Sequence, residues 1–214
     1  MRVEWLGHAC FLITASDGTK ILTDPYDPSV GYRDIDVDAD VVTVSHAHYD
    51  HNYVSGVGGS PEVVDGPGKR TVKGIEFLGV EAFHDTSGGA QRGRNTIFVF
   101  EVDGLRVCHL GDLGHPLTED QRREIGEVDV LLVPVGGYFT IGPKEAWEVI
   151  EQLKPKVVIP MHFKTPSVSL PISPVDEFLS GKPNVRRLGK SEVELTKESL
   201  PAETEVWVLE PSRG

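Results

Sequence analysis

The chain has 214 residues, of which 39% are hydrophobic and 25% charged, a composition typical of a soluble globular protein with one domain or two small ones. Its net charge of −12 argues against non-specific binding to nucleic acid and against attachment to an anionic membrane surface. No apolar run approaches membrane-spanning length, and the N-terminus lacks the apolar core of a signal peptide, so we expect a cytoplasmic protein.

The first two thirds of the chain carry the short apolar and alternating runs that are typical of β-strands. Asp-Gly dipeptides at 17–18 and 103–104 separate two pairs of these runs and favour tight hairpin turns. The segment 56–68 is rich in Gly and Pro and predicts a loop. The expected strands are 3–6, 9–15, 20–23, 41–44, 74–80, 96–102 and 105–110.

The last third of the chain alternates helix and strand signals. Helices are predicted at 119–125 with Thr118 as N-cap, at 143–153 with Pro143 in the first position, and at 174–179 with Ser173 as cap. Apolar runs at 128–133, 156–160 and 204–209 predict buried strands. Because alternating strands and helices form βαβ units, residues 1–214 are predicted to form one α/β domain with mixed sheets.

A cluster of potential metal ligands follows the apolar run 41–44 directly: His46-Ala47-His48-Tyr49-Asp50-His51. Neutral imidazoles and ionised carboxylates are ligands for divalent metals such as zinc. In extended chain, side chains two residues apart point the same way, so His46 and His48 can share one ion. Asp50 and His51 are adjacent and must diverge, which suits a second ion nearby. The alternative is a polar loop that happens to be rich in histidine.

Three further candidate ligands each follow a different predicted strand. His84 follows the strand at 74–80, Asp112 the strand at 105–110, and His162 the strand at 156–160. Any one of them could be a helix cap or a buried, hydrogen-bonded histidine. Sites in open α/β sheets form outside the carboxyl ends of strands, however, and the shared placement favours one metal site.

These residues together resemble the metallo-β-lactamase superfamily of hydrolases, whose pattern is H-x-H-x-D-H followed by a His, a bridging Asp and a last His. The opening Trp5–Cys10 and the run Gly111–His115 resemble one branch, which includes ascorbate-6-phosphate lactonase and a phosphodiesterase acting on N-acyl phosphatidylethanolamine. The resemblance implies an α/β fold, a four-layer αβ/βα sandwich with two mixed β-sheets. It also implies one metal held by His46, His48 and His84, a second held by Asp50, His51 and His162, and Asp112 as the bridge between them.

The resemblance and the ligand set predict a hydrolase with two divalent metal ions, most simply zinc, with manganese and iron as alternatives. A metal-bridging hydroxide, oriented by Asp50, would attack an ester, lactone or phosphodiester of a small anionic substrate. The alternatives are an iron-dependent dioxygenase on the same scaffold and a metal-binding scaffold without turnover. The substrate, the native metal and any homo-oligomeric state are left open by the sequence.

Several residues are candidates for roles beside the metals. His115 is a candidate proton donor to the leaving group, with a surface position as the alternative. His8 is placed near the site by the branch resemblance and is a candidate substrate contact, with a buried, hydrogen-bonded histidine as the alternative. Tyr138 follows two glycines and a buried strand, where it could line the substrate pocket.

Three cations are candidates for binding a phosphate or carboxylate of the substrate: Lys164, Arg92 and Arg94. Lys164 is two residues from His162, although solvated lysines are the commoner case. Ligand histidines usually donate their outer ring nitrogen to an acceptor, and Asp24 and Asp85 are candidates for this role.

Overall fold

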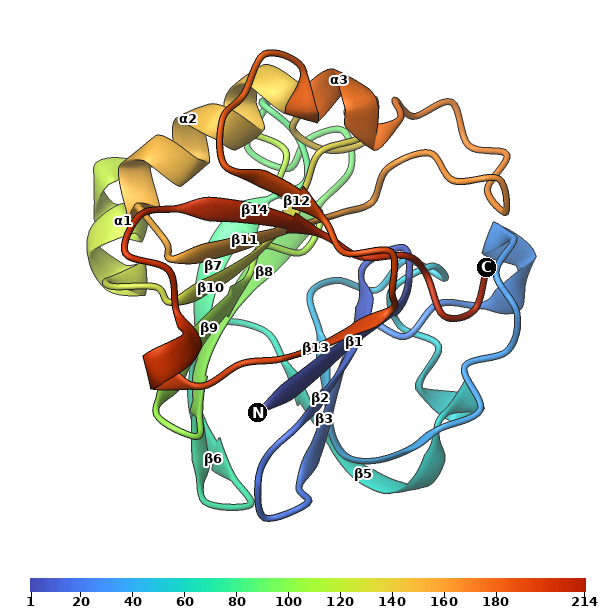
Figure 1. Ribbon diagram of the computed structural model, residues 1–214. Coiled ribbons are helices and arrows are strands. Elements are labelled where there is room, and N and C mark those ends of the chain that lie inside the picture. Colours follow the sequence, from blue (N-terminus) through green and yellow to red (C-terminus); the bar gives the residue numbers. More distant parts are fainter.

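Two β-sheets pack face to face in the computed structural model, which describes residues 1–214 (Figure 1). The first sheet has the spatial order β13 (Glu192–Glu194), β1 (Arg2–Gly7), β2 (Cys10–Thr14), β3 (Lys20–Thr23), β4 (Asp38–Val44) and β5 (Gly58–Asp65). The second has the order β12 (Val185–Arg187), β14 (Glu205–Val208), β11 (Val157–Met161), β10 (Val130–Pro134), β9 (Leu105–His109), β8 (Arg94–Val102), β7 (Ile75–Phe83) and β6 (Gly68–Val72). Both sheets mix parallel and antiparallel pairs, as predicted.

Three α-helices lie on the side of the second sheet that faces away from the first: α1 (Glu119–Ile125), α2 (Pro143–Leu153) and α3 (Val175–Leu179) (Figure 1). The N-cap predicted for α1 is confirmed, because Thr118 and Gln121 form a capping box. The cap predicted for α3 is wrong: Pro174 is the N-cap residue, and the Ser173 hydroxyl donates to Glu177 instead. No helix is both long and apolar enough to span a membrane.

The two hydrophobic clusters explain the layers. The larger one lies between the sheets and under the helices, and it includes Phe11 from the first sheet and Phe98 from the second. The smaller one covers the other face of the first sheet, where Tyr26 and Tyr32 from the segment before β4 belong to the same cluster as Leu22. That outer layer is built from loops and the short 3₁₀ turns Pro28–Val30 and Val54–Gly56. The predicted α/β sandwich is confirmed, with helices on one side only.

The loop predicted over 56–68 is wrong in its larger part, because β5 occupies Gly58–Asp65 and pairs in parallel with β4. This strand lies at the edge of the sheet, and only Val64 among its side chains is buried. Edge strands tolerate proline and do not need an apolar run, so Pro61 and the glycines obscured the strand signal. The short exposed strands β6, β12 and β13 were missed for the same reason.

Candidate metal centre

The predicted ligands lie where the sequence places them, immediately after the strands. Residues 46–51 follow β4, His84 follows β7, Asp112 lies three residues after the end of β9, and His162 follows β11. Strands β9, β10 and β11 are parallel neighbours linked by α1 and α2, so their carboxyl ends meet at one edge of the second sheet. The first sheet brings its ligand loop to the same edge.

The ligands converge on one carboxylate oxygen, Oδ2 of Asp112. It lies 3.2 Å from Nε2 of His51, 3.2 Å from Nε2 of His84, 3.4 Å from Nε2 of His162 and 3.9 Å from Nε2 of His46. Asp112 is 1% exposed. A carboxylate in this central position can contact ligand groups on both sides.

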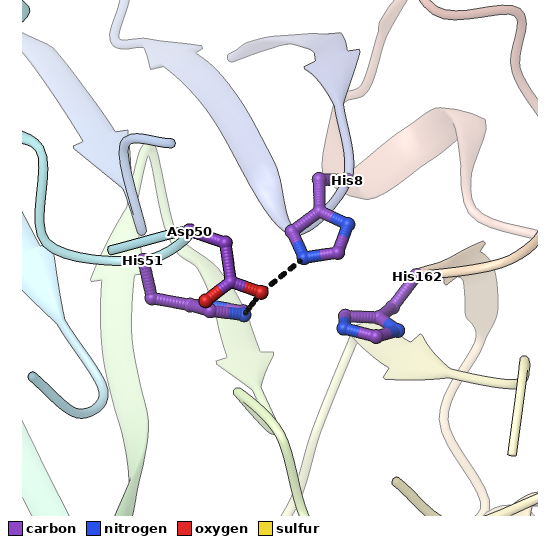
Figure 2. A group of neighbouring side chains, drawn as sticks. All are labelled: His8, Asp50, His51 and His162. Carbon is purple, nitrogen blue, oxygen red and sulfur yellow. Dashed lines mark hydrogen bonds and ion pairs between the residues drawn. The ribbon is translucent and has the colours of Figure 1, made fainter. Parts of the chain in front are cut away.

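The donor atoms form three groups, within each of which all atoms lie within 4.8 Å of one another, and the group of Asp24, His46 and His51 shares one histidine with each of the other two. One of these two contains His46, His48 and His84. The other contains Asp50, His51 and His162, together with His8 (Figure 2). The structure therefore brings together all seven predicted ligands, and it adds His8 to the second group.

Two ligand histidines are oriented through their outer nitrogens. His51 donates from Nδ1 to Oδ2 of Asp24 at 2.8 Å, and Nδ1 of His46 lies 2.9 Å from the Ser45 hydroxyl. Asp24 is fully buried and also accepts from the backbone N–H and the hydroxyl of Ser45. These bonds point Nε2 of both histidines at the centre of the cluster. Asp24 was expected in this role, but Ser45 gave no signal in the sequence.

The Gly111–Asp112 turn depends on close packing that sequence analysis did not anticipate. Asn95, the second residue of β8, donates to the Leu110 carbonyl at 2.9 Å and accepts from the Asp112 N–H at 2.9 Å. Gly111 has φ +56°, and a Cβ atom there would lie 2.4 Å from Asn95 Oδ1. Only glycine fits this combination of left-handed backbone and close approach. Asn95 lies just before the strand predicted at 96–102, so the sequence pattern did not indicate its role.

Burial and charge act in opposite directions on the titrating groups. Burial lowers the pKa of His46 to about 3. Burial disfavours a charged His51, but the carboxylates of Asp112 and Asp50 raise its pKa well above the ordinary value. Burial also opposes ionisation of Asp112, yet His162 and His51 hold its pKa well below the ordinary value. The buried carboxylates therefore require positive charge at the centre of the cluster, which is what a divalent ion provides.

The residues fit two divalent ions by their chemistry as well as their placement. Nε2 of His46, Nε2 of His51 and Oδ1 of Asp112 are buried and have no hydrogen-bond partner. Each such atom costs about 1–3 kcal/mol unless something satisfies it, and all three belong to the cluster. Five imidazoles and two carboxylates are the donors that zinc and related divalent metals prefer.

A hollow of about 520 Å³ opens onto the centre. Its lining combines ligands with apolar and charged side chains: Ala47, His48, Tyr49, Asp50, His84, Arg92, Asp112, Phe139 and Leu170. The Arg92 guanidinium lies over the Phe139 ring, 5.7 Å from its centroid. Among the predicted substrate residues, Arg92 is the one that lines the hollow.

The loop that carries Arg92 is held by one carboxylate. Asp85 Oδ1 accepts from the N–H groups of Ser87 and Gly89, and Oδ2 accepts from those of Gln91 and Arg92, all at 2.7–2.9 Å. These bonds, that to Arg92 first, lower the pKa of Asp85 to about 2. Asp85 thus organises the loop after His84. The prediction that it accepts a hydrogen bond from a ligand histidine is wrong, because its oxygens accept from backbone N–H groups.

The other predicted substrate and proton-transfer residues do not line the hollow. The Lys164 ammonium donates to the Leu170 carbonyl at 2.9 Å, and Arg94 lies 3.5 Å from Glu81. Tyr138 is 65% exposed, and its ring packs against Phe139. Both ring nitrogens of His115 bond to backbone: Nε2 accepts from Phe83 and Nδ1 donates to the Pro116 carbonyl.

Comparison with known proteins assigns the family. The model of the β-lactamase superfamily domain matches residues 2–162. The chain belongs to the metallo-β-lactamase superfamily. Within it, the chain is a member of the UPF0173 family: it is 33% identical over 195 residues to the UPF0173 metal-dependent hydrolase of Thermococcus kodakarensis, an alignment that covers 77% of this chain and 85% of the relative.

Solved structures of the metallo-β-lactamase superfamily agree with this fold. A proposed Zn-dependent hydrolase of the superfamily from Thermotoga maritima is 48% identical, with a TM-score of 0.82 and coverage of 97% of both chains. CmlA, a diiron β-hydroxylase from Streptomyces venezuelae, shares the fold alone, at 17% identity and a TM-score of 0.53 over 75% of this chain and 44% of CmlA. The predicted superfamily and fold are confirmed, and so is membership of a family named for metal-dependent hydrolysis.

Proposed function

We propose that this protein is a hydrolase with two divalent metal ions that cleaves an ester, lactone or phosphodiester bond in a small anionic molecule. The observation that carries the proposal is the convergence of two ligand groups on Asp112 beneath a hollow that Arg92 lines. The resemblance of the Trp5–Cys10 and Gly111–His115 segments to the lactonase and phosphodiesterase branch supports these bond types.

Each ligand has a separate task in this proposal. His46, His48 and His84 hold one ion, Asp50, His51 and His162 hold the other, and Asp112 contacts both. When bound, the ions make hydroxide available near neutral pH and stabilise the negative charge that develops on the substrate oxygen. Asp24 and Ser45 keep His51 and His46 in the ligating orientation.

The lining of the hollow supports a small substrate with an anionic group. Arg92 presents a fork of N–H donors suited to a carboxylate or phosphate, and its main chain is fixed by Asp85. Phe139 and Leu170 provide apolar contacts beside it. The net charge of −12 would repel nucleic acid, so a cytoplasmic small molecule is the substrate we propose.

The test combines metal analysis with a substrate screen. The purified protein, saturated with zinc, manganese or iron and then freed of excess metal, is assayed with lactones, phosphodiesters and thioesters. We expect about two ions per chain and hydrolysis that chelator removes and added metal restores. Oxygen consumption that requires iron, without hydrolysis under any metal, would instead favour the dioxygenase alternative. Bound metal without turnover on a broad panel would favour the scaffold.

A further inference from the structure

His8 occupies a strained and enclosed position at the turn between β1 and β2. Its φ is +54°, in the left-handed region that residues other than glycine seldom adopt, and the residue is 1% exposed. Such a conformation persists only where the surroundings fix it. Here the His8 carbonyl accepts two hydrogen bonds, from Nε1 of Trp5 at 3.0 Å and from the backbone N–H of His162 at 3.1 Å.

The His8 imidazole is directed at Asp50 (Figure 2). Nε2 of His8 lies 3.0 Å from Oδ2 of Asp50, the same oxygen that faces Nε2 of His51 at 3.5 Å. Since an ionised carboxylate only accepts hydrogen bonds, the hydrogen lies on His8 Nε2. The ring also packs on His162, with 4.0 Å between the ring centroids.

His8 thereby contacts ligands that come from different sheets. Asp50 follows β4 in the first sheet, and His162 follows β11 in the second. The distance between Asp50 and His162 therefore depends on how one sheet packs against the other, and His8 contacts both of these residues. The group His46, His48 and His84 does not include His8.

We propose that His8 is a positioning residue for the second metal position: its imidazole holds the Asp50 carboxylate, and its carbonyl holds the backbone of His162. The role rests on the two-ion site of the proposed function. Sequence analysis placed His8 among the substrate contacts, but it does not line the hollow. Removing the hydrogen bond should therefore weaken one metal position and leave the other unchanged.

The experiment measures metal binding without an enzymatic assay. Metal-free wild type, His8→Leu and His8→Gln are titrated with Zn²⁺ against a chromophoric chelator to obtain both stepwise dissociation constants. For His8→Leu we expect one of the two steps to lose about tenfold or more in affinity, the usual effect of losing an outer hydrogen-bond partner, with the other step unchanged. His8→Gln keeps an N–H donor on a side chain of similar reach and should recover most of this loss.

A matched control separates positioning from packing. Cys10→Ala changes a fully buried side chain in the first residue of β2, two residues after His8, so it should lower the unfolding temperature and leave both dissociation constants unchanged. Equal losses for His8→Gln and His8→Leu would make His8 a direct ligand and overturn the positioning role. Unchanged zinc binding in His8→Leu would show that His8 contributes to packing only and would overturn the proposal. A wild type that binds one ion would refute the two-ion site and this role together, whereas two ions without any hydrolysis would refute the proposed activity alone.

Discussion

Asp24 Oδ2 and His51 Nδ1 lie 2.8 Å apart, and both side chains are fully buried. The same oxygen accepts from the Ser45 hydroxyl, which in turn bonds to Nδ1 of His46. One carboxylate therefore orients two ligands that belong to different metal groups.

Asp24→Asn tests this arrangement. The carboxylate accepts three hydrogen bonds, so an amide must turn its NH₂ group toward either the Ser45 N–H or the donors at Oδ2. We expect metal affinity to fall by about 10–100-fold in chelator competition, with the chain still folded. Asp27→Asn is the matched control, because Asp27 caps a surface 3₁₀ turn three residues away and should leave affinity unchanged. Equal affinity in Asp24→Asn and wild type would contradict the role.

The central position of Asp112 gives a second prediction. Asp112→Ala should lose more bound metal than His48→Ala, because Asp112 faces both ligand groups and His48 belongs to one. Elemental analysis after saturation and removal of free metal measures the difference. If the wild type holds about two ions, we expect His48→Ala to retain about one and Asp112→Ala less than one. Similar metal content in the two variants would show that Asp112 is an ordinary ligand of one ion.

The ligand positions could be predicted because the information is local. Each strand that carries a ligand is an apolar run ending just before it, as Val41–Val44 ends before His46. The family pattern then indicated which histidines and aspartates would act together. The edge strand β5 could not be found in this way, since no strand pairs with it on one side and its side chains are mostly exposed.

Contacts made across the fold were beyond the reach of sequence patterns. Asn95 supports Asp112 from 17 residues away, and Ser45 links Asp24 to His46, relations that depend on how strands and sheets pack. The proximity of Lys164 to a candidate ligand in the sequence does not correspond to a role in the hollow. Lys164 lies two residues from His162, but its backbone pairs with Ser173 and its ammonium reaches the Leu170 carbonyl.

Gly111→Ala should destabilise the fold at the metal centre. Its φ of +56° already disfavours a side chain, and a new Cβ would lie 2.4 Å from Asn95 Oδ1 and 2.6 Å from Ser45 Cβ. We expect the overpacking to cost about 1–3 kcal/mol in urea unfolding, beyond the cost of the backbone conformation. Gly189→Ala measures the backbone effect, because Gly189 has a similar φ of +62° with nothing within 4 Å of its added Cβ. Equal losses in the two variants would show that close packing at Gly111 carries no cost.

The lowered pKa of Asp85 predicts that the stability difference between wild type and Asp85→Asn depends on pH. The pKa of Asp85 is lowered to about 2 in the folded chain, chiefly by the Arg92 N–H, so the unfolded chain binds the proton first as the pH falls. The stabilisation from this carboxylate is therefore complete above the unfolded pKa of about 3.9 and is lost as the pH falls through 2. In urea unfolding of metal-free protein, the difference between wild type and Asp85→Asn should be constant from neutral pH to about pH 5 and narrow below pH 4. A difference that widens toward acid would contradict the assignment.

The position of Arg92 in the lining of the hollow predicts a preference for anionic substrates. Arg92 lines the hollow beside Phe139, whereas Arg94, two residues away, is held near Glu81 and does not line it. Arg92→Ala should raise KM for an ester with a remote carboxylate by about 10-fold or more, since charge-assisted hydrogen bonds contribute roughly 1.5–3 kcal/mol. The same ester with a carboxamide in place of the carboxylate should be affected much less, and Arg94→Ala should change neither. Because the pair of esters shares a leaving group, the ratio of the two effects reports recognition of the anion alone. A ratio near one for Arg92→Ala would remove Arg92 from substrate binding and leave the metal ions as the sole source of attraction for an anion.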